Sequence, residues 1–208
     1  MTPVITAGAR DLGILAALIA DAFCDLPPSR WLISDPDARR RLLPGYFRLY
    51  LDHALTAGVI CTTADRDAAA LWIPAGHQPP APPPDYPDRL AAATGPWTRQ
   101  FVLFDAALER AHPVGVPHHH LAILAVRPGR QGHGTGTALL SACHHTLDQA
   151  AIPAYLEASS PRNRSLYLRH GYQDHGPPIR LPGGPPMYPM WRQPAPLMNP
   201  HQERQSVQ

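Results

Sequence analysis

A glycine-rich turn between an apolar run and a helical pattern constrains this chain more than any other feature. Residues 121–126 are uninterrupted and apolar, as in a central strand covered on both faces. The turn at residues 131–136 reads Gln-Gly-His-Gly-Thr-Gly, and the apolar spacing after it predicts a helix over residues 134–150. Glycines permit a sharp turn and the close approach of a ligand, and a helix start offers free N–H groups to a phosphate. The pattern therefore predicts a strand–turn–helix unit that binds a phosphate or pyrophosphate.

The remaining patterns predict an α/β fold, because strands and helices alternate around this unit. Strands are expected at residues 4–6, 59–63, 68–73, 152–159 and 187–191, with a further strand beginning at Tyr172. Helices are expected at residues 11–23, 36–57, 89–112 and 163–170. Pro27-Pro28 is expected to stop the first helix, Pro44 to kink or restart the second, and Gly95-Pro96 to interrupt the third.

Composition favours one folded domain. The chain has 208 residues, of which 44% are hydrophobic and 16% charged, so we expect one domain over residues 1–193. A proline-dense loop is predicted at residues 79–87 and a disordered tail at residues 194–208. The net charge of +2 is too small to indicate a nucleic-acid partner.

Cysteine usage and the chain start indicate a cytoplasmic protein. The three cysteines are far apart and lack a C-x-x-C pairing, which favours reduced thiols over a disulfide framework. The first residues do not resemble a signal peptide, and no apolar stretch is long enough to suggest a membrane span.

Three other uses of the glycine turn fit the sequence less well. A Walker loop needs a lysine, and the chain contains none. A dinucleotide fold needs G-x-G-x-x-G near the first strand, whereas the order here is G-x-G-x-G, late in the chain. The motif alone does not exclude a third interpretation, in which the turn only packs a helix against a strand and binds no ligand.

The turn and a second block downstream together resemble the GNAT superfamily of N-acetyltransferases. Gln131-x-x-Gly134-x-Gly136 is similar to the pyrophosphate loop of that superfamily. The downstream block comprises Pro-Ala-Tyr-Leu-Glu-Ala-Ser at residues 153–159, Pro161-Arg162-Asn163, Leu166-Tyr167 and His170-Gly171-Tyr172. Within the superfamily it is similar to the branch that contains puromycin N-acetyltransferase. The resemblance is strongest over residues 118–172 and weaker in the N-terminal half.

The resemblance implies a GNAT fold, with a mixed central β-sheet, a splay between the two central strands and helices on both faces. It implies acetyl-CoA, or another acyl-CoA, as the co-substrate, with pantetheine in the splay. The cofactor-binding residues that it implies are Leu124, Ala125, Val126, Arg130, Gln131, Gly132, His133, Gly134, Thr135, Gly136, Thr137, Asn163 and Tyr167. Asn163 can also cap the short helix that contains it.

The implied reaction is direct attack of an amine on the thioester. Tyr167 matches the family tyrosine near the thioester sulfur, and its phenol is suited to protonate the leaving thiolate. Glu157 is the first candidate for the base that deprotonates the amine. His118 and His120 compete with it, because imidazole has a suitable pKa and alternate residues share one strand face. Relatives often carry aromatic residues where His119 and His120 stand, so the base assignment stays open.

The histidine triplet has no accompanying ligands at tetrahedral spacing in the sequence, so no metal is expected. The acceptor is expected to be a small-molecule amine, such as an antibiotic or a biosynthetic intermediate, without a nucleic-acid or membrane partner. Two alternatives remain, namely acyl transfer from an acyl carrier protein and a non-catalytic acyl-CoA-binding protein of regulatory function. The sequence is compatible with a monomer or a homodimer.

Overall fold

The fold is described from a computed structural model, which covers residues 2–77 and 85–196. Its helical segments are η1 (Ala9–Asp11), α1 (Leu12–Phe23), α2 (Pro27–Leu32), α3 (Pro36–Ala57), α4 (Tyr86–Thr94), η2 (Gly95–Trp97), α5 (Thr98–Ala111), α6 (Thr135–Gln149) and α7 (Pro161–Leu168). Its strands are β1 (Val4–Thr6), β2 (Val59–Thr63), β3 (Ala68–Ala75), β4 (His118–Val126), β5 (Ala154–Ala158), β6 (Gln173–Asp174), β7 (Ile179–Arg180) and β8 (Pro186–Arg192). The α/β fold that the sequence predicts is confirmed.

The strands form one mixed sheet in the order β1-β2-β3-β4-β5-β8-β6, and β7 pairs with β8 off this path. The pair β4–β5 is parallel, and the other pairs are antiparallel. Because parallel neighbours need a crossover connection, α6 joins the end of β4 to the start of β5. The glycine turn therefore lies at the carboxyl end of β4.

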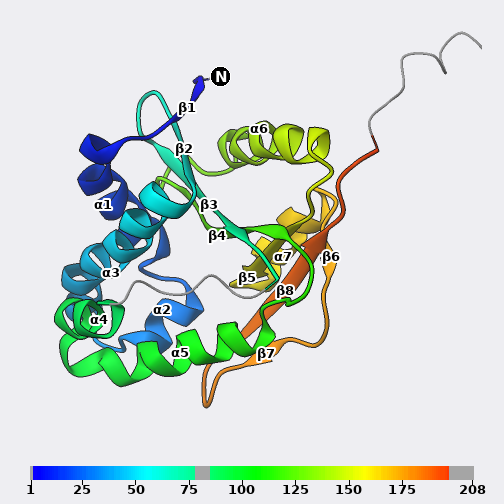
Figure 1. Cartoon of the computed structure of the whole chain (residues 1–208). Coiled ribbons are helices and arrows are strands. Elements are labelled where there is room, and N and C mark those ends of the chain that lie inside the picture. The colour runs from blue at the N-terminus through cyan, green and yellow to red at the C-terminus, as the bar shows by residue number, and fades with distance from the viewer. Residues whose placement is uncertain (1, 78–84, 197–208) are drawn as a thin grey trace, which may run out of the picture.

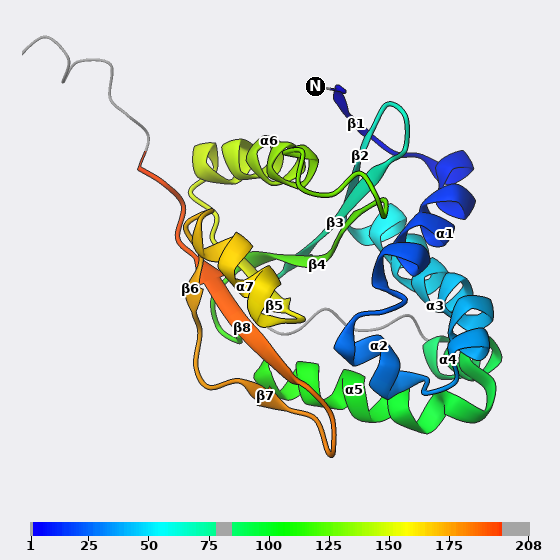
Figure 2. The same ribbon diagram turned by 180° about the vertical axis from the view of Figure 1, so that it is seen from behind.

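Helices cover both faces of the sheet. Figure 1 shows α1 to α5 on one side of the central strands and α6 on the other. Seen from behind, α7 lies in front of β5 and β8, on the side of α6 (Figure 2). Two hydrophobic cores result, because alternate residues of β3 point to opposite faces. The first core is built by α1, α3 and α5, and the second by α6 and α7.

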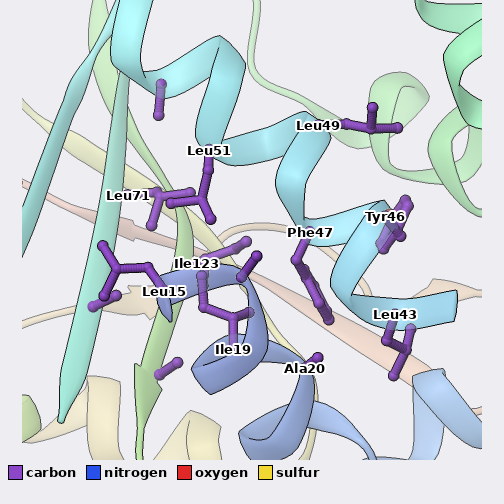
Figure 3. Packing of buried hydrophobic residues seen from close by; sticks show 14 of the residues in the cluster. Leu15, Ile19, Ala20, Leu43, Tyr46, Phe47, Leu49, Leu51, Leu71 and Ile123 are labelled. Carbon is purple, nitrogen blue, oxygen red and sulfur yellow. The ribbon is translucent and has the colours of Figure 1, made fainter. Parts of the chain in front are cut away.

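The first core fixes the helices that stand over β3 and β4. In Figure 3, Leu15 and Ile19 of α1 and Leu51 of α3 converge on Leu71 of β3 and Ile123 of β4. All five side chains are at most 3% exposed. At about 25 cal/mol per Å² of apolar area, burying one such side chain stabilises the fold by roughly 1.5–3 kcal/mol. This packing holds α1 and α3 above the middle of β4.

The middle of β4 is irregular in two ways. The register with β3 shifts between Leu71 and Trp72, so that Ala122 is an extra residue without a partner in β3. Consequently Ala122 and Ile123, although consecutive, both pack against the first core. In addition, β4 pairs with β5 only at His119 and His120. Beyond His120 the two strands separate, which is the splay that the family resemblance implied.

Some predicted elements differ in detail. Pro27-Pro28 does not stop α1, which ends at Phe23; the two prolines instead begin α2, where their missing N–H groups cost nothing. Helix α3 runs without a break across Pro44 and begins at Asp35, whose carboxylate accepts a 2.7 Å bond from the Ala38 N–H. The two-residue strand β7 was not predicted.

The predicted strand at residues 152–159 is shorter in the structure, and the predicted helix at residues 163–170 begins earlier, at Pro161. The proline-dense loop predicted at residues 79–87 falls partly outside the described residues, and its last residues begin α4 at Tyr86. Most of the predicted tail, residues 197–208, is likewise outside them. Among the helices that are described, none has the length and apolar character required to cross a membrane.

Candidate active site

Two cavities meet where β4 and β5 separate. The first, which we call the apolar cavity, has a volume of about 120 Å³ and lies between β4 and helices α1, α3 and α5. The second, which we call the loop cavity, has a volume of about 490 Å³ and follows the glycine turn and α7. Five residues line both cavities: Phe23, Leu26, Leu124, Asn163 and Tyr167.

The glycine turn forms one wall of the loop cavity. Gly132 and Gly134 have φ of +83° and +84°, a region that side chains with a Cβ rarely adopt. Gly134 is the N-cap of α6 and has no side chain to bond to the first N–H groups of that helix. These N–H groups and the positive end of the helix dipole are therefore free to hold an anion.

Most of the predicted cofactor-binding residues line the loop cavity. They are Leu124, Ala125, Val126, Arg130, Gln131, Gly132, Gly134, Thr135, Gly136, Thr137, Asn163 and Tyr167. His133 is not among them; it is exposed, and its Nδ1 lies 2.9 Å from the Gln131 carbonyl oxygen. The Gln131 side chain donates a 3.2 Å bond to the Val126 carbonyl, which ties the turn to the end of β4.

Helix α7 brings two arginines to the loop cavity that were not predicted to bind. Arg162 and Arg169 line it beside Arg130. The Arg130 side chain is 71% exposed, and its Nε lies 3.6 Å from Asp67 Oδ2. In the sequence, an arginine in a short polar segment cannot be told apart from one that is simply exposed to solvent. Only the position of α7 beside the glycine turn shows that these two arginines line the cavity. The three guanidinium groups make the loop cavity electropositive.

Asn163 lies at the third position of α7 and does not cap it. Ser160 is the N-cap, since its hydroxyl accepts a 3.2 Å bond from the Asn163 N–H. The suggested capping role of Asn163 is therefore wrong. The side-chain amide of Asn163 instead donates a 2.9 Å bond to Ser159 Oγ, which orients it at the junction of the two cavities.

A hydrogen-bonded pair of titratable residues opens on the apolar cavity. His120 Nε2 lies 2.8 Å from Glu157 Oε2, across the point where β4 and β5 part. The Glu157 side chain is only 6% exposed, and its Oε1 has no hydrogen-bond partner. Burial alone would raise the pKa of Glu157, but the charge and hydrogen bond of His120 outweigh it and hold that pKa below its usual range. Glu157 is thus a carboxylate at neutral pH.

The rest of the histidine triplet lies away from both cavities. His118 is 1% exposed; its Nδ1 lies 2.8 Å from the Val116 carbonyl oxygen and its Nε2 lies 3.2 Å from Nε2 of His112. Burial lowers the pKa of His118 and of His119. His118 and His120 do share a strand face, as alternation predicts, because both rings pack against the ring of His112.

His112, which the sequence did not single out, completes this cluster. One donor atom from each of His112, His120 and Glu157 lies within 4.8 Å of the other two. No residue that could bind a metal lies at a regular sequence spacing from the histidine triplet. His112 reaches the triplet only because the fold places the end of α5 beside β4. A His-Pro pair after a helical pattern carries no signal by itself.

Tyr167 presents a buried phenol at the junction of the two cavities. It is 9% exposed, and burial raises its pKa, so the hydroxyl keeps its proton at neutral pH. Ser29 and Ser159 also line the apolar cavity, but most other side chains that line it are aromatic or aliphatic: Phe23, Leu26, Pro28, Leu32, Tyr46, Phe47, Tyr50, Phe104, Leu108 and Met187. Tyr46 of α3 lines this cavity, whereas Phe101 of α5 is fully buried in the first core.

Comparison with known proteins agrees with this geometry. Residues 100–174 match the acetyltransferase (GNAT) domain family. A solved Corynebacterium glutamicum protein, described as histone acetyltransferase HPA2 and related acetyltransferase, is 28% identical with a TM-score of 0.69, over 96% of this chain and 100% of that one.

Two solved insect enzymes are similar in fold alone. Arylalkylamine N-acetyltransferase 2 from Aedes aegypti is 11% identical with a TM-score of 0.57, over 93% of this chain and 99% of that one. Polyamine N-acetyltransferase from Drosophila melanogaster is 16% identical with a TM-score of 0.56, over 92% and 98%.

Proposed function

Because residues 100–174 match the acetyltransferase (GNAT) domain family, we propose that this chain moves an acetyl or other short acyl group from acyl-CoA to the amine of a small molecule. The observation that carries the proposal is the junction of the two cavities at Tyr167 and Asn163. A donor in the loop cavity and an acceptor in the apolar cavity would meet there.

The loop cavity suits the donor. Acyl-CoA supplies the reactive thioester together with a pyrophosphate that carries negative charge. Free N–H groups at the start of α6 and the guanidinium groups of Arg162 and Arg169 match that charge. The backbone of β4 beyond His120 has no partner in β5, which leaves polar groups for the amides of pantetheine. These groups belong to Leu124 and Val126, because the backbone groups of Ala125 between them point towards β3.

The apolar cavity suits an amine with an apolar body. Its 120 Å³ is near the roughly 150 Å³ of an engineered apolar cavity that binds one benzene molecule. The acceptor portion that enters it would therefore be about one ring in size. The puromycin-type resemblance of residues 118–172 leads us to include antibiotics and biosynthetic intermediates in this class.

The chemistry needs a base for the amine and an acid for the sulfur. An ammonium group loses one proton to the His120–Glu157 pair, and the neutral nitrogen attacks the thioester carbonyl. The new C–N bond forms, the C–S bond breaks, and Tyr167 donates its proton to the departing thiolate. The nitrogen of the new amide then gives up its second proton, which restores the Tyr167 phenol. Glu157 accepts the Nε2 hydrogen of His120, so Nδ1 of His120 keeps the lone pair that receives the proton. His118 takes no part, because it lies outside both cavities.

The test is calorimetric titration of acetyl-CoA, CoA and pantetheine into the purified chain, followed by thiol-release assays with a panel of amines. The panel should contain arylalkylamines, aliphatic amines, polyamines and aminonucleosides. We expect acetyl-CoA to bind and at least one amine of apolar body to release CoA. Equal affinity for pantetheine and CoA would favour a carrier-protein donor. Acetyl-CoA binding without turnover of any amine would favour the non-catalytic alternative.

A further inference from the structure

The imidazole and carboxylate groups beside the apolar cavity form a set of converging donor atoms. His112 ends α5, His120 lies on β4 and Glu157 on β5, and one donor atom of each lies within 4.8 Å of the other two. A tetrahedral Zn²⁺ with bonds of about 2.0–2.1 Å needs its ligand atoms about 3.3 Å apart. Side-chain movements of about 1 Å, well within rotamer adjustment, would close that difference.

Hydrogen bonds around the cluster leave one lone pair on each histidine. The His118 Nδ1 faces the Val116 carbonyl, so it must carry the hydrogen, and its Nε2 must accept. The His112 Nε2, 3.2 Å away, is then the donor, and the lone pair of His112 falls on Nδ1. An outer hydrogen bond of this kind accompanies nearly every histidine that binds a metal, because it fixes the tautomer. Between His120 Nε2 and Glu157 Oε2, which are 2.8 Å apart, a metal bound by both residues would replace the shared hydrogen, which leaves as a proton.

Glu157 gives an independent sign that this cluster binds a ligand. Its Oε1 is buried without any hydrogen-bond partner, although its Oε2 is engaged by His120. An unpaired buried carboxylate oxygen costs free energy unless a cation, a water or a substrate group satisfies it.

We propose that His112, His120 and Glu157 bind a divalent transition-metal ion, with Zn²⁺ as the best match. Two histidines and one glutamate are a known zinc donor set that leaves a fourth position open. Calcium and magnesium are disfavoured, since they prefer oxygen ligands. If the proposed function holds, the metal takes the place of the hydrogen shared by His120 and Glu157, disrupts the proposed base and therefore inhibits acyl transfer.

The test measures metal binding directly, using the full chain freed of metal with a chelator. Zn²⁺ is titrated calorimetrically, and Co²⁺ is followed by its visible absorption, which is intense only in four- or five-coordinate sites. His112→Ala removes one ligand, and His112→Gln removes it while keeping an N–H donor for His118. His145→Ala is the matched control, because His145 is an exposed histidine on α6 that contacts Gln149.

We expect one saturable site in the wild-type chain and in His145→Ala. Either His112 variant should lower the affinity for the metal by at least about 10–100-fold. Loss of a residue that only hydrogen-bonds to a metal ligand typically lowers the affinity by that factor, and His112 is a ligand itself. No saturable binding to the folded wild-type chain, or unchanged binding in both His112 variants, would overturn the proposal.

Activity provides a second readout. Added Zn²⁺ should inhibit the wild-type chain reversibly but should not inhibit the His112 variants, when each protein is compared with its own rate without metal. If no transferase activity is found but binding depends on His112, the metal site stands and the proposed function fails.

Discussion

Glu157 Oε2 lies 2.8 Å from His120 Nε2, beside the last residue of β4 that pairs with β5. The point where the two strands separate therefore also positions the two residues of the proposed base. Glu157→Gln keeps the size of the side chain and an oxygen acceptor but removes its charge. We expect kcat to fall by roughly 10²–10⁴, the usual contribution of a positioned acid or base, because His120 then loses the carboxylate that stabilises its protonated form.

The measurement is steady-state thiol release together with calorimetric affinity for acetyl-CoA, which should stay within about twofold of wild type. Glu109→Gln is the control, since Glu109 is an exposed glutamate on α5. An unchanged kcat in Glu157→Gln would remove the pair from the mechanism.

Tyr167→Phe tests the proposed acid. The variant loses only the hydroxyl at the junction of the two cavities, so the departing thiolate has no phenol to protonate it. We expect turnover to fall by roughly 10²-fold or more with little change in CoA affinity. Tyr172→Phe is matched in burial and packs against Tyr167 with ring centroids 5.7 Å apart, but its hydroxyl bonds to His144. Turnover that falls equally in both variants would indicate a packing effect and contradict the assignment.

How far sequence predicts this site can be judged from particular residues. Gln131, Gly134 and Gly136 are close in the chain, and their spacing alone placed the turn between β4 and α6. The period of two along a strand predicts that Tyr155, Glu157 and Ser159 share one face. Glu157 and Ser159 do line the apolar cavity, whereas Tyr155 does not. Local periodicity and short motifs are sufficient for features of this kind.

Features that depend on tertiary packing could not be predicted from the sequence. His112 reaches His120 only because α5 ends beside β4, and no spacing in the chain relates the two. Arg162 and Arg169 become part of an anion site only where α7 packs beside the turn. The extra residue Ala122 shifts β4 by one position against β3, and nothing in an apolar run shows which residue will be the extra one.

Gly134→Ala tests the turn. Its φ of +84° strains any residue with a Cβ, although no atom lies within 4 Å of the added methyl group. We expect a stability loss of about 1–2 kcal/mol and a weaker acetyl-CoA affinity, because relaxing the backbone turns the N–H groups of α6 away from the pyrophosphate.

Gly115→Ala is a matched control for that variant. Gly115 has a φ of +83° and equally open surroundings, yet lies outside both cavities. Urea unfolding should show a similar stability loss in both variants, and calorimetry should show weakened binding in Gly134→Ala only. Equal affinity in the two would mean that the turn does not hold the donor.

Oxidation should join Cys61 and Cys143. Their Sγ atoms lie 3.1 Å apart, between β2 and α6, and Cys61 is 8% exposed. With diamide as the oxidant, both thiols lose a hydrogen and a disulfide forms, which should stabilise the chain by roughly 2–4 kcal/mol. Mass spectrometry and thiol titration should show that two of the three free thiols are lost. Cys24→Ser should still form the bond and Cys143→Ser should not; retention of all thiols would contradict the prediction.

His144 should make the fold sensitive to acid. It is buried against Trp72 and Tyr172, and burial, reinforced by the charge of Arg192, lowers its pKa to about 4. The unfolded chain therefore takes up the proton near its ordinary pKa of about 6.5, before the folded chain does. The stability due to neutral His144 is complete above about pH 6.5 and declines as the pH falls towards 4, by roughly 2 kcal/mol at about pH 5.

His144→Gln removes this titration while keeping a hydrogen-bond partner for the Tyr172 hydroxyl, 3.0 Å from the imidazole in the wild type. The variant should be less stable than wild type near pH 7.5 because its amide fills the ring's space poorly, but should lose about 2 kcal/mol less on acidification to about pH 5. Urea unfolding at the two pH values measures both quantities, with His145→Gln, an exposed neighbour on α6, as the control. Equal acid sensitivity in His144→Gln and wild type would show that another group, such as His112, with its pKa also lowered to about 4, governs the transition.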